Sequence, residues 1–191
     1  FPYQSSGWNT LLTSDVSRTQ AWQTDVTFGN DLLYYSGNDA QKMMRYGRLP
    51  IIFIGIILGF YVFRFSRELW GETAGLIALT LYSFSPTVLA HTRLVTTDVA
   101  AAAAFFISFY YLYKWLKIST QRNLWIFGIV FGLALLTKFS TFLLIPIFGF
   151  IVLIYSLFQN QKKLFWIKKY ISGFIFALII SFLIVGIVYA F

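Results

Sequence analysis

The sequence consists mainly of long apolar segments separated by short polar ones, and this alternation restricts the fold more than any single motif. Apolar residues make up 58% of the 191 residues and charged residues only 12%, with a mean hydropathy of +0.70. A soluble domain of this length needs far more polar surface, because its exterior meets water on every side. The composition therefore predicts an integral membrane protein.

The lengths of the apolar segments predict an all-α fold, a polytopic bundle of about six transmembrane helices. A helix that crosses a bilayer needs about 20 mostly apolar residues. The segment 124–158 is too long for one crossing, and the polar interruption at 137–140 divides it into two short helices that meet near Lys138. The predicted spans are about 49–65, 74–90, 99–116, 124–137, 140–158 and 171–190.

Residues 1–48 precede the first predicted span, and we expect them to form an extracytoplasmic loop segment before the bundle of residues 49–191. Asn38 or Asp39 can cap a short interfacial helix that Gly47 ends. Two interpretations remain open for this segment. It is either a loop held at the interface by its aromatic side chains or a loop that covers a substrate.

The distribution of Lys and Arg predicts the orientation, since short cytoplasmic loops carry an excess of both. If residues 91–98 lie outside, nine of the fifteen basic residues fall on the opposite side. The net charge of +8 is then a topology signal, and we expect membrane lipids rather than nucleic acid as partners. The nine residues are Arg64, Arg67, Lys114, Lys117, Arg122, Lys162, Lys163, Lys168 and Lys169.

The octapeptide 91–98 holds the only histidine of the chain, His91, and one of its seven acidic residues, Asp98. It follows Pro86, which removes a helix hydrogen bond and can bend the preceding span. If the octapeptide is helical, His91 and Asp98 share one face. The segment is therefore the best candidate for one wall of a functional site.

Two roles are open for Asp98. Aspartate at a helix start is most often a cap, and its charge suits the positive end of the helix dipole. Alternatively, a carboxylate at a membrane boundary can act as a general base on an acceptor hydroxyl or amine. The alanine run 100–104 leaves little bulk beside Asp98, which allows either close helix packing or room for a substrate.

Four basic or neutral donors are candidates for binding a phosphate on the same side: Lys138, Arg93, His91 and Arg48. Each also has a simpler interpretation. Lys138 can snorkel to the interface, the two arginines can be surface anchors, and His91 can bond to carbonyls at a helix end.

A metal centre is not predicted from these residues. Cysteine is absent, and His91 with Asp98 gives two ligands where catalytic metal sites normally need about three. No cofactor is evident, and no glycine-rich nucleotide loop is found. A divalent metal would have to be held through residues outside this sequence.

Several ordered pieces between about residues 47 and 146 resemble the bacterial family-39-type members of the GT-C glycosyltransferases, the relatives of protein O-mannosyltransferases and lipid A aminoarabinose transferases. The resemblance lies in their order rather than in any one motif. The pieces are Gly47-Arg48-Leu49-Pro50, the run from Leu69 to Leu76, Ser85-Pro86, Leu89-Ala90-His91, Thr96-Thr97-Asp98, Gly132-Leu133-Ala134 and Thr137-Lys138.

The resemblance implies a sugar transfer from a polyprenyl-phosphate donor to a protein, lipid or glycan acceptor on the extracytoplasmic face of a bacterial plasma membrane, with inversion at the sugar carbon. Asp98 matches the acidic residue of the family's second outer loop, and Lys138 matches a basic residue near the lipid phosphate. The family's first outer loop carries another acidic residue before a His-Pro-Pro-like segment. Neither is identified here, so we expect the chain to be a fragment that begins after them and lacks part of its active site.

Two other classes of function are consistent with the same residues. A transporter or flippase could use Asp98, His91 and Lys138 to line a solute or proton path, and would place them near the middle of the membrane. A noncatalytic subunit of a membrane complex would have no cavity beside Asp98. A transferase instead gathers its charges at one surface.

Overall fold

The computed structural model describes residues 26–35, 37–159 and 163–190. The chain divides into two compact units, residues 1–49 and residues 50–191. The described part contains helices and no strands, which confirms the all-α prediction. The elements are η1 (Asp31–Tyr35), α3 (Ala40–Trp70), α4 (Glu72–Ser83), α5 (Pro86–His91), α6 (Asp98–Lys117), α7 (Gln121–Leu135), η2 (Phe139–Leu143), α8 (Leu144–Leu157) and α9 (Lys163–Tyr189).

In the first unit, Asp39 caps the start of α3, because its Oδ1 accepts a hydrogen bond of 3.0 Å from the Lys42 backbone N–H. The short helix predicted to end at Gly47 does not end there. Helix α3 continues through Gly47 and Pro50 to Trp70. A glycine inside a helix costs only about 1 kcal/mol relative to alanine, and the apolar run that follows extends the helix.

Four helical segments are long and apolar enough to cross a membrane: Ala40–Trp70, Asp98–Lys117, Phe139–Leu157 and Leu164–Tyr189. Helix α7 is apolar but has only 15 residues. The predicted span 74–90 is divided between α4 and α5, and Pro86 begins α5. The predicted number of about six crossings therefore remains a prediction.

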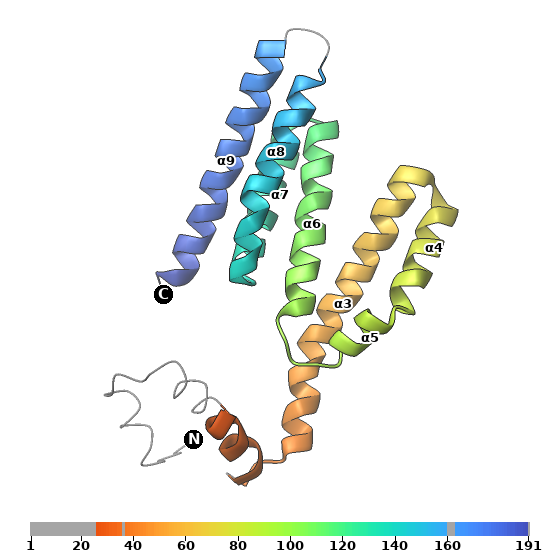
Figure 1. Cartoon of the computed structure of the whole chain (residues 1–191), viewed down its shortest axis with the longest axis vertical. Coiled ribbons are helices and arrows are strands. Elements are labelled where there is room, and N and C mark those ends of the chain that lie inside the picture. The colour runs from red at the N-terminus through yellow and green to blue at the C-terminus, as the bar shows by residue number, and fades with distance from the viewer. Residues whose placement is uncertain (1–25, 36, 160–162, 191) are drawn as a thin grey trace. The chain divides into compact units, whose positions relative to one another are not determined.

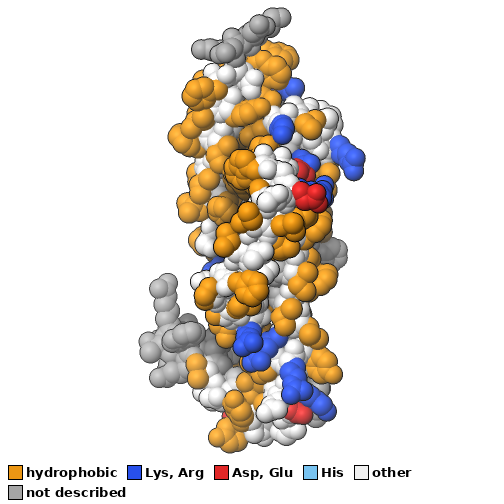
Figure 2. Space-filling view, turned by 90° about the vertical axis from the view of Figure 1, so that its right-hand side faces the viewer, with side chains coloured by type: hydrophobic (Ala, Val, Ile, Leu, Met, Phe, Trp, Pro, Cys, Tyr) orange, Lys and Arg blue, Asp and Glu red, His pale blue; other side chains and the backbone are white. Residues whose placement is uncertain are grey.

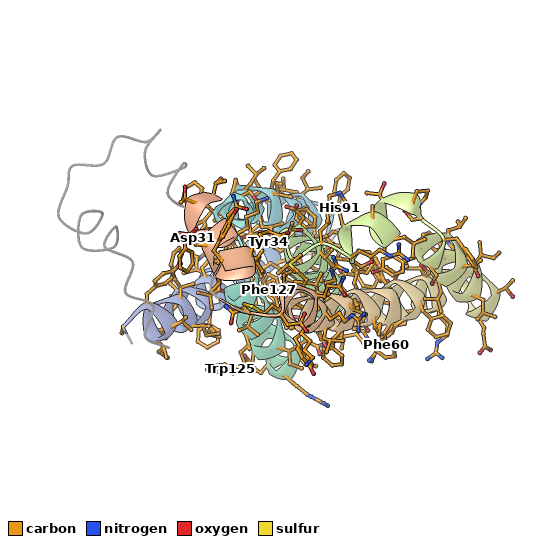
Figure 3. All side chains as sticks on the ribbon, turned by 90° about the horizontal axis from the view of Figure 1, so that it is seen from below. Asp31, Tyr34, Phe60, His91, Trp125 and Phe127 are labelled. Atoms are coloured by element: carbon orange, nitrogen blue, oxygen red, sulfur yellow. The ribbon has the colours of Figure 1, made fainter. Side chains whose placement is uncertain are left out.

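Helices α6 to α9 lie side by side and enclose the core of the second unit (Figure 1). Phe127 and Phe131 on α7 are fully buried and pack against Phe148 of α8. Figure 3 shows Phe127 surrounded by helices. Small residues allow helices α7 and α9 to approach closely. At this contact the Ser181 hydroxyl on α9 donates a 2.9 Å hydrogen bond to the Gly128 carbonyl on α7.

Helix α4 turns back along α3 after Gly71, whose φ of 91° lies in the region that favours glycine. The Tyr82 hydroxyl on α4 donates a 2.7 Å hydrogen bond to the Gly55 carbonyl on α3. A Cβ atom at Gly59 would lie 2.9 Å from the Tyr82 ring, so glycine is needed for this contact. The α3–α4 hairpin thus carries α5 back along α3.

A polar cluster joins α3 to α6 at the other end of α6 from Asp98. The Glu68 carboxylate accepts a 2.7 Å hydrogen bond from the Tyr110 hydroxyl and lies 3.2 Å from the Lys114 ammonium. Between such groups the surface is mostly apolar: the face in Figure 2 shows hydrophobic side chains over most of its area and charges in a few patches. This pattern fits a bundle embedded in lipid.

Candidate functional site

Two connections meet at one end of the second unit: residues 92–97 between α5 and α6, and residues 136–138 between α7 and η2. The octapeptide is not helical. His91 is the last residue of α5, Asp98 is the first residue of α6, and the residues between them form turns and a bend. The break in the long apolar stretch near Lys138, predicted from the sequence, is confirmed.

Asp98 and Lys138 form an ion pair across these two connections. The Lys138 Nζ atom donates a hydrogen bond of 2.8 Å to Asp98 Oδ1, and each side chain is 46% exposed. At this distance the ammonium stabilises the negative charge of the carboxylate. The two residues are 40 positions apart in the sequence, and the structure brings them together in an ion pair that the sequence analysis did not predict.

The capping role considered for Asp98 is not observed. The N-cap of α6 is Thr97, and no side chain donates or accepts a cap hydrogen bond there. The Asp98 carboxylate is used by Lys138 instead. Because both side chains are about half exposed, the ion pair adds little to stability. The same exposure leaves both groups accessible for binding or chemistry.

Two threonines shape the segment that presents Lys138. Helix α7 ends at Leu135, and Lys138 itself has an extended backbone. The hydroxyls of Thr137 and Thr141 both donate to the Ala134 carbonyl, at 2.8 and 2.9 Å. Thr141 is buried and was missed by the sequence reasoning, although a hydroxyl residue just after a helix end is a recognisable signal for such bonds.

His91 lies beside the ion pair without joining it by a hydrogen bond. Its Nδ1 atom is 4.0 Å from Asp98 Oδ2, beyond hydrogen-bond distance. This nitrogen is buried and has no hydrogen-bond partner among the described residues, and the same holds for Thr96 Oγ1. Figure 3 shows His91 on the short helix α5. The histidine is therefore a polar group that a ligand could satisfy.

A cavity of about 250 Å³ adjoins the pair and is lined by His91, Asp98, Tyr82, Val88 and Ala102, among others. Ala102 belongs to the alanine run, so the run provides room beside Asp98. A larger apolar cavity of about 470 Å³ between α3 and the α4–α5 segment shares Tyr82 and Val88 with it. Tyr82 and Val88 thus border both the cavity beside Asp98 and the larger apolar cavity.

The other two candidates are not part of this cluster. Arg93 lies exposed in the 92–97 connection, where no acidic side chain of the described residues forms an ion pair with it. Arg48 lies in α3 within the first unit. Of the residues proposed from the sequence, three lie close together in the structure: Asp98, Lys138 and His91.

Among the residues that the structure describes, no three His, Cys, Asp or Glu side chains gather closely enough to hold a metal ion. The charges lie at helix ends: Asp98 begins α6, and Lys138 follows the last turn of α7. Both charged side chains therefore lie at one end of the second unit.

The comparison with protein families agrees with this geometry. The family described as dolichyl-phosphate-mannose-protein mannosyltransferase matches residues 40–187, which include the whole site. No curated protein and no solved structure gave a match. The chain belongs to the dolichyl-phosphate-mannose-protein mannosyltransferase family, and it is a membrane glycosyltransferase of the mannosyltransferase type.

Proposed function

We propose that the protein transfers a sugar from a polyprenyl-phosphate donor to a protein or other acceptor on the extracytoplasmic face of the membrane, by inverting displacement. The observation that carries the proposal is the 2.8 Å Asp98–Lys138 pair beside a cavity that has a larger apolar cavity as its neighbour. A charged group at the end of an apolar path suits a ligand with a phosphate at one end and a long hydrocarbon chain at the other.

In the proposed reaction, an acceptor hydroxyl or amine attacks the sugar carbon, and the bond from that carbon to the phosphate oxygen breaks. The Asp98 carboxylate takes the proton of the acceptor as the new bond forms. The polyprenyl phosphate leaves with the electron pair, and Lys138 stabilises its charge. His91, whose Nδ1 lacks a partner, supplies a further hydrogen bond to the phosphate or the sugar.

The ion pair gives this mechanism a binding step. Lys138 is held by Asp98 when no phosphate is present. The phosphodiester of an arriving donor carries one negative charge, as the carboxylate does, and by competing for the ammonium it leaves the carboxylate free to accept a proton. Binding of the donor would then activate the base, and Arg93, in the connection that precedes Asp98, would be an additional phosphate contact.

The role of Asp98 can be tested with Asp98→Asn in the full-length protein, assayed in membranes with radiolabelled polyprenyl-phosphate mannose. Loss of the general base should lower transfer by about 100-fold or more. Glu72→Gln is the matched control, because Glu72 is an exposed acid in the first turn of α4 and should be replaceable without effect. Normal turnover by a well-expressed Asp98→Asn protein would exclude Asp98 from the chemistry.

A charge reversal separates chemistry from structure. The double variant Asp98→Lys with Lys138→Asp keeps an ion pair but exchanges the positions of the carboxylate and the ammonium group. We expect its thermal unfolding to match the wild type and its transfer activity to remain as low as that of Asp98→Asn. Recovery of transfer by the reversed pair would show that the pair only holds the two connections together.

A further inference from the structure

A second polar cavity, of about 320 Å³, lies at the end of α6 to α9 away from the Asp98–Lys138 pair. The turn between α6 and α7 forms one side of it, and the first turns of α9 form the other. Its polar lining consists of Ser119, Thr120, Gln121, Lys169 and Ser172. None of these residues takes part in the proposed transfer reaction.

Lys169 provides a positive charge that the protein does not neutralise at this cavity. Among the described residues it forms no ion pair, and the sequence contains no acidic residue after Asp98. Its Nζ atom lies 4.8 Å from the centre of the Trp166 ring, a distance at which cation–π attraction acts. The ammonium is thus held at the cavity with its hydrogen-bond donors unused.

A buried aromatic ring and several polar groups line this cavity. Trp115, which is 2% exposed, lines it, and a Cβ atom at Gly173 would lie 2.4 Å from the Trp115 ring. The Thr120 Oγ1 atom accepts a hydrogen bond from the Asn123 backbone N–H, which leaves the hydroxyl hydrogen free to donate. Lys169, Thr120 and Gln121 all line the cavity and can donate hydrogen bonds to an acidic ligand.

The surroundings favour a lipid over a free anion. Phe176 lines the cavity and packs against Trp125 with ring centroids 5.1 Å apart. Trp125 is 49% exposed. On α9, Ile175 and Ile179 lie near Phe176 and are 52% and 53% exposed. These apolar side chains can face acyl chains, while the aromatic rings suit the depth of lipid headgroups.

We propose that this cavity binds the phosphate of an anionic membrane phospholipid, at a site separate from that of the sugar donor. The excess of Lys and Arg at this end predicts that it faces the cytoplasm, whose leaflet is rich in anionic lipid. Basic pockets between transmembrane helices bind such headgroups elsewhere. The site would anchor the α6–α7 turn and α9 to the membrane.

The test uses the full-length protein in detergent and follows thermal unfolding during titration with phosphatidylglycerol. We expect stabilisation by phosphatidylglycerol, but not by phosphatidylcholine or by inorganic phosphate. Lys169→Gln should raise the half-saturating lipid concentration about fivefold, the effect of one lysine near a headgroup. Lys168→Gln is the control, because Lys168 is the exposed neighbour with the same charge and does not line the cavity.

Two outcomes would overturn the proposal. Equal losses in Lys169→Gln and Lys168→Gln would mean that the lipid responds to overall charge, and equal stabilisation by inorganic phosphate would mean a free-anion site. Ser172→Phe offers a second variant that should fold, because Ser172 is exposed, and it fills the cavity without changing any charge. Undiminished lipid stabilisation in that variant would also contradict the cavity as the site.

Discussion

The position of the Lys138 ammonium depends on a few hydrogen bonds of neighbouring residues. The Thr141 hydroxyl bonds to the carbonyls of both Ala134 and Lys138, at the point where the chain leaves α7 and enters η2. These bonds hold the extended residue between two helices. The site therefore rests on a buried threonine that does not itself reach the cavity.

We predict that Thr141→Val weakens donor binding while leaving most of the fold intact. Valine keeps the shape but loses the hydroxyl, so Lys138 becomes less well positioned. The KM for the polyprenyl-phosphate donor should rise about fivefold, the equivalent of one hydrogen bond of about 1 kcal/mol. Steady-state kinetics of the full-length protein measures this rise.

Thr80→Val is the matched control for this prediction. The Thr80 hydroxyl makes the same kind of bond, to the Leu76 carbonyl at 2.9 Å, on an exposed face of α4. Its loss should leave the donor KM unchanged. If both variants shift KM equally, the effect belongs to threonine removal in general and not to the position of Lys138.

At the same scale, the sequence argument assigned Asp98 and Lys138 to one side of the membrane, but it did not predict that they form an ion pair. Alternating basic loops determine the end of the bundle on which a residue lies, so two residues far apart in the chain could be assigned to one face. Side-chain packing is not contained in that argument. The 4.0 Å gap between His91 and Asp98, and the bonds of Thr141, depend on how the two connections fold.

Among the elements, the contact between α7 and α9 depends on glycine. A Cβ atom at Gly132 would lie 2.9 Å from the Ser181 Cα atom and 3.1 Å from its carbonyl oxygen. Backbone atoms cannot move aside as a flexible side chain can. Any larger residue at this position therefore has to push the two helices apart.

We predict that Gly132→Ala destabilises the protein by about 1 to 3 kcal/mol, the usual cost of overpacking. Gly186→Ala on α9 is the control, because a Cβ atom there meets nothing within 4 Å. It should be neutral or slightly stabilising, since alanine favours a helix over glycine. Thermal unfolding in detergent compares the two, and a Gly132→Ala protein as stable as the wild type would contradict this account of the contact.

The elements themselves were predicted unevenly from the sequence. The polar residues 137–140 indicated the end of one helix and the start of the next, and the structure has that break between α7 and η2. Gly47 suggested a helix end, but α3 continues through it. A local signal such as glycine is weak, and helix propagation over an apolar run of more than ten residues outweighs it.

At the scale of the whole molecule, the two proposed sites lie at opposite ends of helices α6 to α9. Helices α6 to α9 alternate in direction (Figure 1), so the turn after α6 and the connection after α7 lie at opposite ends. The Asp98–Lys138 pair lies at one end and the Lys169 cavity at the other. If the bundle crosses the membrane, a lipid-linked donor and an anionic phospholipid would bind in different leaflets.

This topology can be measured directly because residues 1–191 contain no cysteine, so each introduced cysteine is the only thiol in this part of the protein. Leu94 and Phe139 are 49% and 87% exposed beside the pair, and Ile118 is 54% exposed in the α6–α7 turn. We predict that a membrane-impermeant maleimide added to intact cells labels Leu94→Cys and Phe139→Cys. Ile118→Cys should be labelled only after the membrane is opened.

The same experiment decides whether the divided segment α4–α5 completes a crossing. Trp70, 75% exposed, is the last residue of α3, directly before Gly71 and the start of α4. If α3 crosses in one direction and α4 with α5 returns, Trp70→Cys should behave like Ile118→Cys and be protected in intact cells. Labelling of Trp70→Cys from outside would show that α4 and α5 do not cross, because α6 must still begin on the side of Asp98.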